Sequence, residues 1–201
     1  MSVTVHNIFP TPVGQFSLNR EVTAEEIAFA EAQTAHRNMG NSTSDNRYVL
    51  KDPALADISK FIEESVAAYF KAIYVPKNEV SLRVTQSWLN YSKPEEWHHR
   101  HAHANSFVSG VFYIKAANAE DRIYFHKDGY AQIQVTTKEY NLCNSTSWWF
   151  SVNTGMLLLF PSGLTHSVDP VKGDNVRVSL AFNTFPVGYV GEEDNLTALH
   201  L

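Results

Sequence analysis

A dense histidine cluster is the feature of the sequence that most clearly points to chemistry. Four of the nine histidines lie in the run 97–103, Trp-His-His-Arg-His-Ala-His. His101 and His103 are two residues apart, so on a strand both rings point to the same side and can reach one ion. Imidazole is a common ligand of transition metals. The cluster predicts a metal site; the alternative is a polar loop with surface histidines.

His166 is the candidate for the rest of this site. It follows a buried apolar strand and a tight turn within residues 155–163, and it begins another strand. Such a histidine on its own is more often a structural residue than a ligand. Its setting, and the residues that come after it, favour the ligand interpretation.

Arg177 and Ser179 form a candidate anion receptor. Ten residues separate His166 from Arg177, and two residues at i and i+2 on a strand share a face. A guanidinium fork beside a hydroxyl suits a carboxylate. The alternative is an ordinary salt bridge on an exposed strand, because alternation does not tell whether this face meets water or a cavity.

Helices are expected to precede these motifs. Residues 3–8 alternate weakly and predict a short strand. Thr23 and Glu26 match a capping box, which predicts a helix to about His36. Asp52-Pro53 predicts the start of an amphipathic helix that ends at Val75-Pro76.

A run of short strands is expected to hold the motifs. Turn signals separate them, and their number and spacing are typical of a jelly roll or barrel. We therefore predict an α+β fold with a double-stranded β-helix (jelly-roll) core and N-terminal supporting helices, as one domain over residues 1–201. Its expected parts are the strand and helices in 1–76, the core in 79–185 and an irregular tail in 186–201. The expected core strands cover residues 80–91, 107–114, 123–125, 131–136, 148–152, 156–160 and 176–182.

Composition narrows the classes of function. The chain has 201 residues, 44% of them hydrophobic, and a net charge of −5. This balance gives no strong nucleic-acid signal, and no apolar run is long enough for a membrane span. The single cysteine, Cys143, excludes an intramolecular disulfide. No signal peptide is recognised, so we expect a cytoplasmic protein.

Taken together, these motifs resemble the 2-oxoglutarate/Fe(II)-dependent oxygenase superfamily. The general pattern is His-x-Asp/Glu, a distal His, and Arg-x-Ser about ten residues later. The sequence looks most like the branch of oxygenases found in tailed phages, marine cyanobacterial phages especially, and in some bacteria. The segments that carry this likeness are 7–14, 87–91, 101–106, 109–113, 160–162, 177–183 and 185–191.

The resemblance implies a dioxygenase with Fe(II) and 2-oxoglutarate as cofactors. It implies that His101, His103 and His166 are the catalytic metal ligands, and that Arg177, assisted by Ser179, binds the far carboxylate of 2-oxoglutarate. Relatives such as prolyl hydroxylases often have a 2-oxoglutarate-binding tyrosine about ten residues before the first ligand. Tyr91 stands there, and Asn90, on the other strand face, is the alternative.

One position departs from the family pattern. His103 stands where the carboxylate ligand is usual, so an iron ion held here would be one charge unit more positive. With this departure, the resemblance supports the fold and the 2-oxoglutarate pocket more strongly than it supports turnover. His99 or a water molecule in place of His103 is a further alternative, and Asp121 and Asp128 are downstream carboxylates.

Two other interpretations remain open at this point. The pattern from Gly155 to His166 also looks like the second motif of cupins, which include three-His dioxygenases, although the cupin glutamate is missing after His103. A jelly roll is also a common scaffold for non-catalytic phage structural or binding modules. The substrate, whether a protein, a lipid or a small molecule, is unknown, and a homo-oligomer is an open alternative.

Overall fold

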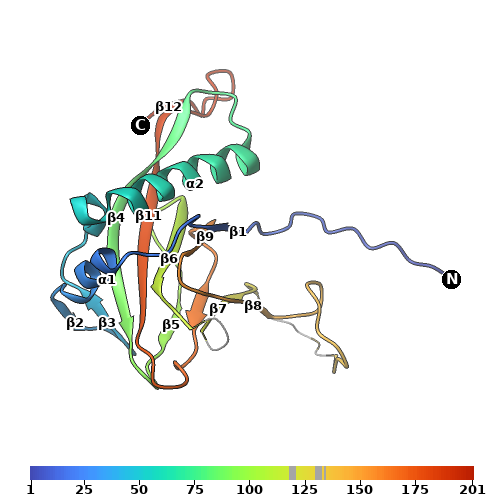
Figure 1. Ribbon diagram of the computed structural model, residues 1–201. Helices are drawn as coiled ribbons and strands as arrows, with labels where there is room; N and C mark the ends of the chain where they lie inside the picture. Colours follow the sequence, from blue (N-terminus) through green and yellow to red (C-terminus); the bar gives the residue numbers. More distant parts are fainter. Residues whose placement is uncertain (118–120, 130–132, 134) are drawn as a thin grey trace.

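The computed structural model describes residues 1–117, 121–129, 133 and 135–201. Two sheets form the core, as Figure 1 shows. The larger has the strand order β1-β9-β6-β11-β4-β3-β2, with β12 pairing β11, and the smaller has the order β5-β10-β7-β8. Strands close in sequence are split between the two sheets, as in a jelly roll, so the α+β prediction with a jelly-roll core is confirmed.

The elements follow one another along the chain with short 3-10 helices before the long helix. In order they are β1 (Gly14–Ser17), α1 (Ala24–Glu31), β2 (Ala35–Arg37), β3 (Ser42–Ser44), η1 (Val49–Lys51), η2 (Pro53–Leu55), α2 (Ala56–Tyr74), β4 (Val80–Ser92), β5 (His98–His101), β6 (Val108–Lys115), β7 (Arg122–His126), β8 (Ser147–Ser151), β9 (Met156–Pro161), β10 (His166–Val168), β11 (Arg177–Val190) and β12 (Leu199–His200).

The central strands of the large sheet are buried on both faces. On β6, Phe112 and Ile114 join the cluster under the helices, whereas Val111 and Tyr113 join the cluster between the sheets. This is the period-2 alternation of a strand, and it explains why these strands read as continuous apolar runs. A polar residue on the inner face of such a strand must therefore enter the space between the sheets.

The long helix α2 covers the outer face of the large sheet (Figure 1). Its apolar residues Ile58, Ile62 and Val66 are almost fully buried against strand residues such as Leu89 and Phe112. Burying such side chains contributes roughly 1.5–3 kcal/mol each, so α2 anchors the sheet from behind. Within the described residues, no helix is both long and apolar enough to cross a membrane.

Helix starts agree with the sequence, whereas some ends do not. The capping box at Thr23 is present, and Asp52 accepts a hydrogen bond from the backbone N–H of Ala54 at the start of η2. The first helix ends at Glu31 and not near His36, because residues 35–37 pair as β2 with β3. The pairing of a distant strand overrides the local helical pattern.

Two further predictions, for residues 3–8 and for the C-terminal tail, need correction, and a third is not tested. Residues 3–8 form no strand, since β1 begins only at Gly14, where it pairs with β9. The tail from residue 186 is not wholly irregular, because β11 continues to Val190 alongside β4 and pairs with β12. The expected strand at 131–136 falls largely outside the described residues.

Candidate active site

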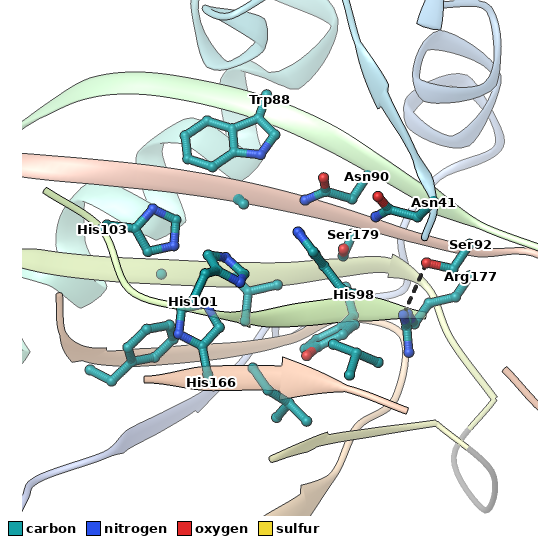
Figure 2. A pocket seen from close by; sticks show the side chains of 17 residues that line it. Asn41, Trp88, Asn90, Ser92, His98, His101, His103, His166, Arg177 and Ser179 are labelled. Carbon is teal, nitrogen blue, oxygen red and sulfur yellow. Dashed lines mark hydrogen bonds between the residues drawn. The ribbon is translucent and has the colours of Figure 1, made fainter. Parts of the chain in front are cut away.

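A pocket lies between the two sheets and brings the sequence motifs together (Figure 2). The smaller sheet contributes histidines, and the larger sheet contributes polar residues from the inner faces of β4, β6 and β11. Its lining residues are Asn41, Trp88, Asn90, Ser92, His98, His101, His103, Gly110, Val111, Tyr113, Ile123, Phe160, His166, Val168, Arg177, Ser179 and Ala181.

Three histidines form one wall of this pocket. One potential ligand atom from each of His101, His103 and His166 lies within 4.8 Å of the other two. His101 and His166 are directly opposite in the pairing of β5 with β10, and their ring centroids are 4.3 Å apart. His103 lies beyond the end of β5, not at the start of a strand, yet its ring stacks on His166 at 5.2 Å. These three groups have the number and closeness that a transition-metal site needs.

Backbone carbonyls set the orientation of two of these rings. Nδ1 of His101 lies 2.7 Å from the carbonyl oxygen of His99, and Nδ1 of His166 lies 3.0 Å from that of Leu164. A carbonyl only accepts, so each Nδ1 carries the proton and donates it. Each Nε2 then keeps its lone pair free, which is the usual arrangement for a metal-binding histidine.

Burial keeps the three rings neutral at neutral pH. It lowers the pKa of His103 to about 4, with a further contribution from His101. It lowers the pKa of His166 to about 3, again with repulsion from His101. The pKa of His101 is also lowered, chiefly by burial. Neutral imidazoles present lone pairs to a cation without first losing a proton, so the donor set fits a metal ion.

A second group of histidines shares one member with the first. His98, His99 and His101 also have potential ligand atoms within 4.8 Å of one another. Of the three, only His101 has a ring oriented by a backbone carbonyl through Nδ1. Across the part of the chain that the structure describes, neither group includes a carboxylate, so the three-imidazole character expected from the sequence is retained.

Arg177 lies at the other end of the pocket and is only 4% exposed. Its Nη1 is 3.4 Å from a carboxylate oxygen of Asp121, and its Nη2 donates to Ser92 Oγ at 3.0 Å. Burial lowers its pKa, and Tyr113 and Asp121 oppose that shift, but a guanidinium stays protonated in proteins. The strand face of Arg177 is therefore a cavity and not water, which the alternation in the sequence left open.

Strand register brings further polar groups into line beside Arg177. Ser179 on β11 is directly opposite Asn90 on β4 and Tyr113 on β6. All three side chains line the pocket. The next row inward, Trp88, Ala181 and Val111, is apolar. The pocket thus has a polar end suited to an anion and an apolar middle.

Asn90 and Tyr91, the two candidates on β4 for binding 2-oxoglutarate, point to opposite faces of the large sheet. Asn90 faces the pocket. Tyr91 points to the helical side, where its hydroxyl donates to the carbonyl oxygen of Ala30 at 2.6 Å. It packs against the cluster under the helices and is not among the pocket residues.

Several residues that line the pocket were not predicted from the sequence. Ser92 and Asn90 are two apart, as Arg177 and Ser179 are, and this repeated spacing on paired strands is a signal that could have found Ser92. Tyr113 lies within the apolar run of β6 and gives no such signal. Asn41 also lines the pocket, and only the tertiary structure brings it there. His98, which belongs to the histidine cluster seen in the sequence, lines the pocket as well.

The downstream carboxylates Asp121 and Asp128, and two exposed tryptophans, lie outside the histidine site. Asp121 is the buried partner of Arg177, and Asp128 is an exposed partner of Arg100; neither is in a histidine group. Trp148 and Trp149 are 40% and 44% exposed on the edge strand β8 and do not line the pocket.

Comparison with known proteins agrees with this geometry. Residues 86–183, just under half of the chain, match the model of a family described as "Putative 2OG-Fe(II) oxygenase". This span begins in β4. It contains His101, His103 and His166, and also Arg177 and Ser179. No curated protein sequence matches the chain significantly.

Solved structures share the fold at low sequence identity. HygX from Streptomyces hygroscopicus, with nickel, 2-oxoglutarate and hygromycin B bound, is 13% identical, with a TM-score of 0.57 over 87% of this chain and 82% of that one. A prolyl-4-hydroxylase from Pseudomonas putida is 16% identical, with a TM-score of 0.52 over 86% and 92%. An oxidoreductase of the 2OG-Fe(II) oxygenase family from Burkholderia pseudomallei is 13% identical, with a TM-score of 0.56 over 80% and 76%. At these identities the likeness concerns the fold.

Proposed function

We propose that this chain is a member of the 2-oxoglutarate/Fe(II)-dependent oxygenase superfamily, whose family model matches residues 86–183, and that it is a non-haem Fe(II) dioxygenase of the hydroxylase type with 2-oxoglutarate as co-substrate. One observation carries the proposal: a single pocket has three neutral imidazoles on one side and a buried guanidinium at its far end. A ligand with a metal-chelating head and a distant carboxylate matches both features.

The residues divide into two roles in this proposal. His101, His103 and His166 hold Fe(II) through nitrogen lone pairs, and backbone carbonyls keep two of the rings in place. Arg177 and Ser179 bind the far carboxylate of 2-oxoglutarate, with Asn90 as a lining residue. Bound iron supplies the redox chemistry with O₂; the protein orients the co-substrate and limits water in the pocket. Tyr91 has no place in this assignment, because its hydroxyl is turned to Ala30.

The decisive experiment loads metal-free protein with Fe(II) under anaerobic conditions and adds 2-oxoglutarate. Chelation gives a weak visible metal-to-ligand charge-transfer band, and His101→Ala is the blank. The band in the wild type, and its absence in His101→Ala, supports the proposal. Fe(II) binding without the band favours a cupin-like three-His metal oxygenase, and no Fe(II) binding favours a non-catalytic jelly-roll module.

Turnover is a separate question because no carboxylate accompanies the histidines in the described residues. An anionic ligand would offset part of the positive charge on the metal. We therefore expect His103→Asp to keep Fe(II) and to raise the rate of 2-oxoglutarate consumption by roughly tenfold, about 1.4 kcal/mol in barrier. Succinate formation measures it. An unchanged or lower rate would mean that the three-His site is the competent form.

We also propose a family branch and a cellular location for the protein. The combination of motifs supports a place in the phage-associated oxygenase branch, and a cytoplasmic location is consistent with that place.

A further inference from the structure

Asn41 is a buried polar residue that this function has not used. Its relative exposure is 0%, and it lines the same pocket as the histidines and Arg177. Neither its Nδ2 nor its Oδ1 has a hydrogen-bond partner among the residues that the structure describes. Leaving a buried donor or acceptor unpaired is costly, so an orphaned carboxamide aimed into a pocket points to a ligand that completes it.

The sheet places Asn41 at the anion end of the pocket. It directly precedes β3, in which Ser42 is opposite Tyr91 and Thr43 is opposite Asn90. Continuing that antiparallel register by one residue brings Asn41 to Ser92. Ser92 is in turn opposite Arg177 on β11 and accepts a hydrogen bond from its guanidinium. Figure 2 shows the carboxamide of Asn41 beside Asn90 and Ser92.

The backbone before Asn41 is held firmly. Gly40 has a positive φ of +84°, a conformation that favours glycine, and a Cβ there would lie 2.8 Å from the ring of Trp97. The Trp97 N–H donates to the carbonyl oxygen of Gly40 at 3.0 Å, and the Asn38 N–H donates to that of Asn41 at 2.8 Å. This turn presents the side chain without relying on any bond of the carboxamide itself.

At the arginine end of the pocket, the charge of Arg177 is partly compensated, so uncharged hydrogen-bond donors contribute more to binding an anion. Arg177 already faces the carboxylate of Asp121, which is 1% exposed. An incoming carboxylate therefore meets a guanidinium that is partly compensated. Uncharged N–H and O–H donors around it must then supply part of the recognition.

We propose that Asn41 is a specificity-determining residue that binds the far carboxylate of 2-oxoglutarate. This inference rests on the proposed function. In the complex, Nδ2 of Asn41 donates to a carboxylate oxygen. Ser92 accepts from Arg177, so its own hydroxyl proton is available to Oδ1 of Asn41. The β2–β3 hairpin is then part of the co-substrate pocket, although it lies outside the segment that matches the oxygenase family model.

The test compares wild type with Asn41→Leu, which keeps the size of the side chain and removes its polar atoms. Dissociation constants for 2-oxoglutarate are measured anaerobically with the Fe(II)-loaded proteins, and Fe(II) binding is measured separately. We expect 2-oxoglutarate binding to weaken about tenfold, the loss of one hydrogen bond to a charged group, and Fe(II) binding to be unchanged. The melting temperature without ligand should hold or rise, because no orphaned polar atoms remain.

A second ligand assigns the effect to the far carboxylate. 2-Oxobutyrate has the same 2-oxo acid head without that carboxylate, so Asn41→Leu should bind it as the wild type does. Asn41→Asp, nearly isosteric but anionic, should weaken 2-oxoglutarate binding further. The matched control is Asn195→Leu at an exposed asparagine, which should change neither constant.

The outcomes separate this inference from the proposed function. A wild type that binds Fe(II) but no 2-oxoglutarate would overturn both. Wild-type binding that is equally strong in Asn41→Leu, or equally weakened for 2-oxoglutarate and 2-oxobutyrate, would overturn the role of Asn41 alone. If Asn41→Leu does not fold, Asn41→Asp provides the test: weaker binding of 2-oxoglutarate but not of 2-oxobutyrate supports the inference, and any other result overturns it.

Discussion

The two ends of the pocket are built on different principles. At the histidine end, short strands of the small sheet hold neutral rings, and backbone carbonyls together with burial keep their lone pairs free. At the arginine end, long strands of the large sheet hold a permanent charge with its own buried counter-ion, Asp121. The histidine end suits a cation because its imidazoles are uncharged and offer lone pairs. The arginine end suits an anion because Arg177 is positively charged, although Asp121 balances part of that charge.

This difference means that the two ends should respond separately to substitution. A metal ligand can be lost from the small sheet without changing the cross-strand rows of the large one. By contrast, removing Arg177 leaves the Asp121 carboxylate, which is 1% exposed, without its counter-ion. Stability and ligand binding are therefore linked at the arginine end and largely separable at the histidine end.

The largest expected effect is on metal binding in His166→Ala. Losing an outer partner of a metal ligand already costs about 10–100-fold in affinity, so losing the ligand itself should exceed about 100-fold. Metal content after anaerobic loading and gel filtration measures this, with His200→Ala on the exposed β12 as control. Stoichiometric Fe(II) in His166→Ala would remove His166 from the site.

Arg177→Ala should affect both 2-oxoglutarate binding and folding. The lost charge-assisted contact should weaken binding about 10- to 100-fold while Fe(II) binding is spared. The uncompensated Asp121 should cost about 3–5 kcal/mol of unfolding free energy. The double variant Arg177→Met/Asp121→Asn should recover most of that stability but not the binding, as urea denaturation and ligand titration would show. Unchanged affinity for 2-oxoglutarate in Arg177→Ala would disprove the anion assignment.

Acid should destabilise the metal-free protein through the histidine end. Burial lowers the pKa of His103 to about 4 and that of His166 to about 3, against about 6.5 in the unfolded chain. Between these values the unfolded state binds more protons, so stability falls as pH falls from 6.5 toward 4, by at most about 1.4 kcal/mol per pH unit for each group.

Denaturation of His103→Phe isolates this contribution, because carboxylates that also titrate in acid are common to both proteins. The slope of unfolding free energy against pH should be shallower in His103→Phe. Equal slopes for the two proteins would mean that His103 is not held neutral by burial.

The smallest effect is expected for Tyr91→Phe. Its hydroxyl donates to Ala30 on the helical side, so the variant should lose about 1 kcal/mol of stability and keep its affinity for 2-oxoglutarate within about twofold. Asn90→Leu, on the pocket side of the same strand, is the comparison. A strong loss of binding in Tyr91→Phe alone would reverse the assignment of the two residues.

Local patterns predicted much of the fold and of the candidate site. The capping box at Thr23 appears as expected, because capping involves atoms only three residues apart. The shared face of Arg177 and Ser179 is present, because strand alternation depends only on backbone geometry. The strand expected at residues 3–8 is absent because a strand also needs a partner, and none of the described residues pairs with that segment.

The order of the amino acids specifies the types of ligand and their spacing: three imidazoles, a guanidinium and a hydroxyl on predicted strands. It does not specify which face of each strand lines the pocket, that Asp121 balances Arg177, or that Asn41 reaches the anion end; these come from the folded arrangement. The physical reason is that these relations depend on register between strands distant in the chain. Register is set by how all the strands and α2 bury their apolar faces together, and no short segment contains that information.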